Sequence, residues 1–101
     1  MKIENLYGVA NQLLISHGTK IAFQSYASCI AVYDMYTGEM KVGPDWNYSS
    51  TTSRHFKLFV NNKTRFLYET SEKFRKEMER NPKITFVEDL DLQEELQRLD
   101  T

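Results

Sequence analysis

Residues 39–60 read EMKVGPDWNYSSTTSRHFKLFV, and the hydrophobic pattern changes within this stretch. Before Pro44, polar and apolar side chains alternate, which is typical of a half-solvated strand. A Gly-Pro pair stops this pattern, and hydroxyl and amide side chains of the kind that cap helices follow it. Phe56, Phe59 and Val60 then recur at helical spacing. The stretch therefore predicts a sheet followed by helices, which is an α+β fold.

The residues before this stretch predict further strands. Apolar, β-branched and aromatic side chains gather in residues 12–16, 20–25 and 29–34, and turn signals separate these runs. The simplest arrangement is a small antiparallel meander of three to four strands within residues 12–43. A further short strand is expected at 83–87, where apolar residues return.

Two helices are predicted after the sheet, at about 51–61 and 70–80. The first ends at Asn61-Asn62, and the second is capped by Thr70 or Ser71 and ends before Pro82. Both helices are expected to pack on one face of the sheet. The side chains expected to make this contact are Phe56, Phe59, Phe74 and Met78.

The last 14 residues, 88–101, are acidic. Asp89 or Asp91 can start a third helix, with Leu92, Leu96 and Leu99 on one face. A docked amphipathic helix and a partly frayed tail are both open interpretations of this segment. The whole chain, 1–101, is expected to form a single domain, because its length suits one hydrophobic core.

The composition limits the classes of function. A net charge of −1 argues against a protein that coats nucleic acid by bulk charge and against an acidic DNA mimic. The N-terminal segment lacks the basic start and apolar stretch of a signal peptide, and no apolar run approaches the roughly 20 residues that span a bilayer. We therefore expect a soluble, cytoplasmic protein without a membrane partner.

The motifs of common enzymes and metal sites are missing from the sequence. The four glycines are scattered and form no phosphate-binding loop, and no serine lies in a nucleophile elbow. His17 and His55 lack a third ligand nearby in sequence, so no metal site is expected. The lone Cys29 lies in an apolar run and is interpreted as a small buried side chain. We expect no catalytic residues and no cofactor.

One segment stands out as a candidate binding site. Helix N-termini present unpaired amides and a partial positive charge, so hydroxyls, a basic side chain and two aromatic rings at such a position suit a phosphate or an acidic partner. Residues 46–68 contain four Lys or Arg and no acidic residue. The alternative is an ordinary capped helix with a core tryptophan and a solvated basic face. The candidate residues are Trp46, Tyr48, Ser50, Thr51, Thr52, Arg54 and His55.

Within this candidate site, Arg54 is the expected contact with a partner. Arg54 and His55 are about 100° apart on an ideal helix, so both need not face the same ligand. His55 can then serve as a structural strut. The chain also has six tyrosines, and tyrosines are favoured both at binding interfaces and in the cores of small sheets.

Residues 46–59 also resemble a signature of small proteins encoded by phages and prophages, Trp-x-Tyr-Ser-x-Thr-Thr-x-basic-His-x-x-x-Phe. Those proteins have a short β-rich half before the signature, and residues 13–22, LLISHGTKIA, fit that pattern. The similarity covers roughly residues 12–60. The resemblance implies a phage setting, in which small accessory proteins often inhibit host machinery or host defence.

Two classes of function therefore stand beside each other, with an enzyme third. The leading hypothesis is a small phage-type accessory protein that binds and inhibits a host or anti-phage defence component, such as a CRISPR or other nuclease complex. The alternative is a binding module that sequesters a phosphate-bearing nucleotide signal or contacts nucleic acid at a helix N-terminus. A host or defence protein is the leading partner, nucleotide or nucleic acid is the second, and a homo-oligomer is also open.

Overall fold

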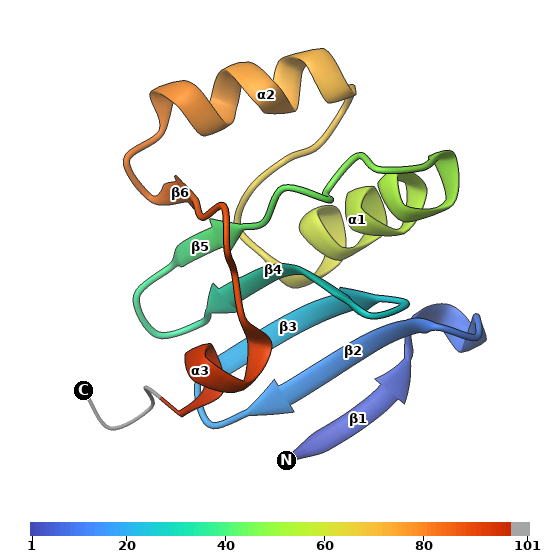
Figure 1. Ribbon diagram of the computed structural model, residues 1–101. Coiled ribbons are helices and arrows are strands. Elements are labelled where there is room, and N and C mark those ends of the chain that lie inside the picture. The colour runs from blue at the N-terminus through green and yellow to red at the C-terminus, as the bar shows by residue number, and fades with distance from the viewer. Residues whose placement is uncertain (98–101) are drawn as a thin grey trace.

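The computed structural model describes residues 1–97, and a single six-stranded sheet organises them (Figure 1). The strands lie in the same order in space as in sequence, from β1 to β6. Neighbouring strands are antiparallel except for β5 and β6, which are parallel. The strands are β1 Lys2–Asn5, β2 Gln12–His17, β3 Lys20–Ser25, β4 Ser28–Asp34, β5 Glu39–Val42 and β6 Ile84–Phe86, and a short 3-10 turn, η1, spans Leu6–Gly8.

The predicted α+β class and the antiparallel meander of residues 12–43 are confirmed, but the sheet is larger than predicted. It has six strands rather than three to four. The short strand expected at 83–87 is β6, and it joins the edge of β5. The unexpected strand is β1, whose four residues are all exposed, so no hydrophobic alternation marks it in the sequence.

Helices cover both faces of the sheet. Two of them, α1 (Ser50–Lys63) and α2 (Ser71–Arg80), contribute to the larger core, while α3 (Leu92–Leu96) packs on the opposite face (Figure 1). Successive residues of a strand point to opposite faces, and β3 illustrates this alternation. Phe23 belongs to the core under α1, whereas its neighbour Ala22 belongs to the core under α3.

The caps of α1 and α2 follow the expected chemistry. Thr70 caps α2 by accepting a hydrogen bond from the Lys73 amide at 3.2 Å. The α1 helix begins one residue before the predicted start and continues to Lys63, two residues beyond the predicted end. The Asn61 side chain does not stop the helix, because it makes two hydrogen bonds to the backbone of Tyr68, at 2.7 and 3.0 Å.

The larger core is built from stacked aromatic rings. Phe23 stacks on Phe59 at 5.8 Å and on Phe56 at 6.4 Å between ring centroids. Trp46 is only 3% exposed and lies 5.6 Å from the ring of Phe74. The predicted packing of both helices is confirmed, since Phe56, Phe59 and Phe74 are buried in the larger core and the half-buried Met78 packs against that core.

Ion pairs hold α3 on the smaller core. Glu95 is 6% exposed, and Lys41 Nζ lies 2.9 and 3.1 Å from its two carboxylate oxygens. Lys20 Nζ also donates a hydrogen bond of 2.8 Å to the Glu95 backbone carbonyl. Leu96 is buried beside these charges. The predicted row of leucines on α3 ended at Leu99, which lies outside the described residues.

Among residues 1–97, no helix is long and apolar enough to cross a membrane.

The first prediction concerns the aromatic core. Phe59 is fully buried and stacks on Phe23, so Phe59→Ala should lower the free energy of unfolding by about 3–5 kcal/mol. Urea denaturation followed by tryptophan fluorescence measures this loss. Leu67→Ala is the control, because Leu67 is 64% exposed and its removal should leave the midpoint nearly unchanged. Equal midpoints for both variants would contradict the core placement of Phe59.

The second prediction uses Cys29 as a reporter of α3 docking. Burial, together with the negative charges of Glu95 and Asp91, raises the pKa of the Cys29 thiol from 9.0 to about 12. The thiol is therefore protonated in the folded protein at pH 8 and should react slowly with iodoacetamide, because the thiolate is the nucleophile. Leu96→Ala should loosen α3 and speed the reaction, which mass spectrometry measures over time.

The same pKa shift has a consequence for stability. A raised folded-state pKa stabilises the fold below pH 9.0, and this contribution is lost as the pH rises toward about 12. Alkaline unfolding should therefore begin at a lower pH than in a Cys29→Ala variant.

For the alkylation experiment, Leu67→Ala is again the control. Wild-type alkylation at the rate of the urea-unfolded chain would contradict the docking of α3 over Cys29.

Candidate functional site

A pocket of about 310 Å³ lies between the β3–β4 turn and the start of α1. Three separate segments of the chain meet there: the turn itself, the segment that leaves β5, and the first turn of α1. The pocket therefore forms only in the folded chain. The residues that line it are Ser25, Tyr26, Ser28, Ile30, Asp45, Tyr48 and Thr52.

Gly43 brings the segment after β5 close enough to form the pocket wall. A Cβ atom at this position would lie 2.8 Å from the Cys29 carbonyl oxygen, so only glycine fits without a shift of backbone. The Gly43 amide donates a hydrogen bond of 2.8 Å to the Ile30 carbonyl. Asp45 then accepts a hydrogen bond of 2.8 Å from the Ser28 hydroxyl. These contacts fix the Asp45 carboxylate at the pocket wall.

Hydroxyl groups join α1 to β3 at the floor of the pocket. The side chains of Ser25 and Thr52 are hydrogen-bonded at 2.9 Å, and each residue is only 3% exposed. Ser49 donates its hydroxyl proton to Thr52 Oγ1 at 3.2 Å and accepts from the Thr52 amide at 3.1 Å. The Ser49 and Thr52 hydroxyls thus bond to one another and to the helix, so their evident role is to anchor α1.

Two exposed tyrosines stand at the rim of the pocket. Tyr48 is 77% exposed and Tyr26 is 59% exposed. Tyr26 occupies the left-handed region, with a φ of 55°, at the first position of the two-residue β3–β4 turn. Glycine or asparagine adopts this conformation most easily, whereas a bulky residue pays roughly 1–2 kcal/mol for it. The sequence therefore keeps an exposed ring at a backbone position that disfavours it.

The charge of the pocket differs from the charge expected at this helix start. Asp45 is the lone charged residue in the lining, and no Lys or Arg is part of it. A pocket with a carboxylate, hydroxyls and two phenol rings suits a cationic or hydrogen-bond-donating group. It does not suit a phosphate, because a phosphate would be repelled by Asp45.

The seven predicted site residues do not converge on one surface. Tyr48 and Thr52 line the pocket. Trp46 lies in the core, with the Arg75 guanidinium 5.3 Å above its ring. His55 is 7% exposed, and its Nδ1 lies 2.8 Å from the Thr51 carbonyl oxygen. Thr51 is half-buried, while Ser50 and Arg54 are exposed on the helix surface.

Sequence reasoning missed the part of the pocket that comes from β3 and β4. Ser25, Tyr26, Ser28 and Ile30 lie at least 15 residues before Asp45, and only the sheet brings them to α1. A signal was nevertheless present in the turn. The predicted strands at 20–25 and 29–34 leave a very short connection, and a tyrosine stands where asparagine or glycine is the usual turn residue.

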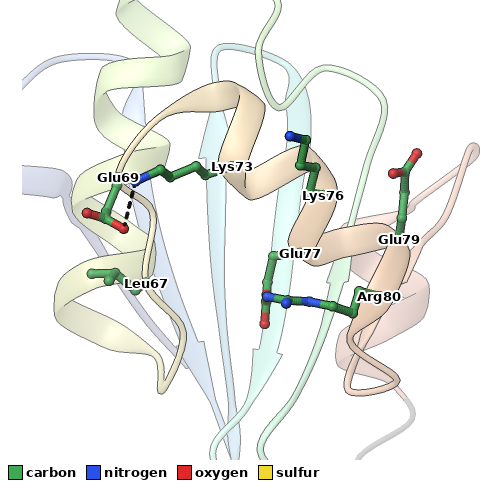
Figure 2. A pocket seen from close by; sticks show the side chains of 7 residues that line it. All are labelled: Leu67, Glu69, Lys73, Lys76, Glu77, Glu79 and Arg80. Atoms are coloured by element: carbon green, nitrogen blue, oxygen red, sulfur yellow. Dashed lines mark hydrogen bonds and ion pairs between the residues drawn. The ribbon is translucent and has the colours of Figure 1, made fainter.

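A second hollow, of about 650 Å³, lies along the outer face of α2 (Figure 2). Its lining includes three acidic and three basic side chains, so it carries no net charge. Figure 2 shows Lys73 reaching toward Glu69 and Arg80 beside Glu77. The Lys73 Nζ lies 3.6 Å from the Glu69 carboxylate. Hydrogen bonds from Arg80 and Asn81 lower the pKa of Glu77. This surface is best explained as a solvated helix face with paired charges.

Metal ligands do not gather in the described part of the chain. Within residues 1–97, no group of three or more His, Cys, Asp or Glu side chains could hold a metal ion.

The family model that matches the chain covers residues 1–80 and describes a family of unknown function, DUF8033. The chain belongs to this family. The matched span contains the whole pocket and ends with α2, so β6 and α3 lie beyond it. No curated protein and no solved structure matches the chain.

Proposed function

We propose that this chain is a binding protein without a catalytic step, and that it docks on a partner protein through the pocket rimmed by Tyr26 and Tyr48. The partner we propose is a host or anti-phage defence component, such as a CRISPR or other nuclease complex, which the bound protein inhibits. The observation that carries this proposal is Tyr26, an exposed ring on a strained turn. Strained backbone positions of this kind cluster at active sites and binding surfaces.

The chemistry of the rim supports a protein partner. Tyrosine gives a large contact area and a polar tip at low entropic cost, so it is enriched in protein interfaces. The pocket, at about 310 Å³, has room for one inserted side chain from a partner. Asp45 favours a lysine or arginine there, and the phenol faces of Tyr26 and Tyr48 add cation–π attraction.

A basic inserted side chain connects the pocket to nucleases. Nucleases that hold guide or target strands line their channels with lysine and arginine. A protein whose pocket accepts one of these side chains competes with the nucleic acid for it. The phage setting itself rests on the resemblance of residues 46–59, and this signature contributes Tyr48 and Thr52 to the pocket.

The second candidate, a site for a phosphate-bearing nucleotide or for nucleic acid, depends on a different surface. Arg54 and Lys57 are exposed on α1, in a stretch from residue 46 to 68 that has no acidic residue. This surface lies outside the pocket lining. The Ser49 and Thr52 hydroxyls are bonded to each other and to the helix, which weakens the case for a phosphate at the helix start.

The third prediction tests the Tyr26 rim. Tyr26→Asn removes the ring and relieves the left-handed backbone, so the melting temperature should stay equal or rise. The same variant should lose inhibition in a plaque assay, in which hosts carrying a panel of nuclease-based defence systems are challenged with phage. Wild-type protein should restore plaques on at least one of these hosts, and Tyr48→Ala should fail as Tyr26→Asn does.

Tyr36→Ala is the matched control for this assay. Tyr36 is 84% exposed but lies in the β4–β5 turn, at the end of the sheet opposite the β3–β4 turn, so its loss should leave inhibition intact. Full plaque restoration by Tyr26→Asn and Tyr48→Ala would exclude the rim as the interface. Failure of the wild-type protein against every system in the panel would remove the inhibitor proposal.

The fourth prediction separates the nucleotide candidate. A nucleotide bound at the start of α1 should raise the melting temperature, with a gain of about 2.7 kcal/mol when its concentration is 100 times Kd. Arg54→Ala should abolish that gain at little cost in stability, because Arg54 is exposed. Thermal denaturation with cyclic and linear oligonucleotides measures the shift. A protein that melts at one temperature with every nucleotide contradicts this candidate.

A further inference from the structure

β1 is an edge strand with an open outer side. It pairs with β2 alone, and within residues 1–97 no other segment adds to its outer edge. All four of its residues are exposed. A strand edge of this kind presents unpaired backbone N–H and C=O groups that another strand can pair with.

The two faces of β1 differ in character. Lys2 and Glu4 lie on one face, with Lys2 Nζ 4.0 Å from the Glu4 carboxylate. Ile3 points to the other face, because it stands directly opposite Ile15, which belongs to the core under α3. Ile3 is nevertheless 58% exposed, which is unusual for an isoleucine beside a core.

An apolar groove of about 670 Å³ continues from Ile3 across this face. It runs between the β1–β2 edge and α3. Met1, at its outer end, is 73% exposed. The apolar residues of its lining are Met1, Ile3, Leu13, Ile15, Leu92 and Leu96.

We propose that the occupant of this edge is a second copy of the same chain. The two β1 strands pair antiparallel about a twofold axis that is normal to the sheet and passes between the two copies of Ile3. The pairing joins two six-stranded sheets into one continuous sheet. Both apolar grooves then lie on the same face, with the two Ile3 side chains in contact where the grooves meet.

The charge sequence of β1 selects this register. A twofold axis normal to the sheet keeps each face on its own side, so one residue of β1 must lie directly opposite the same residue of the second copy, with the axis between them. An axis at Lys2 places Lys2 opposite Lys2 of the second copy, and an axis at Glu4 does the same with two carboxylates. An axis at Ile3 places each Lys2 opposite Glu4 of the second copy. Opposite charges directly across a strand pair are favourable, and like charges are not.

The Lys2–Glu4 charge pattern can make this edge strand attract a second copy, although charged residues on edge strands usually prevent pairing. A lysine on an edge strand usually prevents edge-to-edge pairing. Here Glu4 lies two residues beyond Lys2 on the same face, 4.0 Å from it within one copy, and an antiparallel second copy adds an opposite charge directly across from each of them. The paired strands are only four residues long, so we expect a reversible dimer whose population depends on concentration. The proposal does not use Tyr26 or Tyr48, so its outcome is independent of the proposed function.

The test exchanges the charges of β1, in protein without an N-terminal tag. Sedimentation equilibrium should show a concentration-dependent dimer for the wild type. Lys2→Glu should sediment as a monomer, because its two carboxylates meet two carboxylates, and Glu4→Lys should do so for the matching reason. An equimolar mixture of the two variants should form a heterodimer. The double variant Lys2→Glu with Glu4→Lys should recover the homodimer.

Lys73→Glu is the control, because Lys73 is 67% exposed at its side chain, compared with 73% for Lys2, and lies on α2. It makes the same change of net charge and should dimerise as the wild type does. A wild type that is monomeric at every concentration would overturn the proposal. So would Lys2→Glu and Glu4→Lys dimers of wild-type strength, which would place the contact on another surface. Failure of the mixed variants to associate would reject the Ile3-centred register.

Discussion

The stacking of Phe56 and Phe59 on Phe23 is the contact on which the rest of the molecule depends. Phe23 lies on β3, inside the sheet, and it is fully buried with both partners. Because the two helix positions are three residues apart, they set both the distance of α1 from β3 and its rotation about its own axis. Once these are set, the first turn of α1 meets the β3–β4 turn. The Ser25–Thr52 hydrogen bond and the pocket are consequences of that placement.

The elements that could be predicted are those whose own residues show a hydrophobic pattern. The strands from β2 to β5 contain apolar, β-branched and aromatic side chains because both faces of the sheet are covered, and both long helices have apolar side chains at helical spacing because one face of each is buried. Residues 2–5 carry no such pattern, since β1 is made by its pairing with β2 and not by burial. The pocket escaped prediction for a related reason. Its walls are joined by tertiary contacts such as Ser28 to Asp45, which span 17 positions of sequence.

The two faces of the sheet are held by different physics. The α1 face relies on interlocked aromatic rings, which lose a great deal of buried area if one is removed. The α3 face relies on a few leucines and on the Lys20–Glu95–Lys41 cluster. Removal of Glu95 would leave two lysines without a counter-charge, and the Lys20 side chain is only 12% exposed. The α3 side of this smaller core, which includes Leu90, Leu92 and Leu96, comes from residues beyond 80, where the family match ends.

The hydroxyl-rich start of α1 illustrates how composition can mislead about chemistry. A run of serines and threonines before a helix offers donors for a phosphate, but a donor is available only when the fold leaves it unbonded. Here Thr52 bonds to Ser25 and Ser49, and the pocket beside it contains Asp45 and no basic side chain. The groups that remain accessible to a partner are therefore the rings of Tyr26 and Tyr48 and not the hydroxyls. In the docking that we propose, such a surface selects its partner by shape and by charge complementarity.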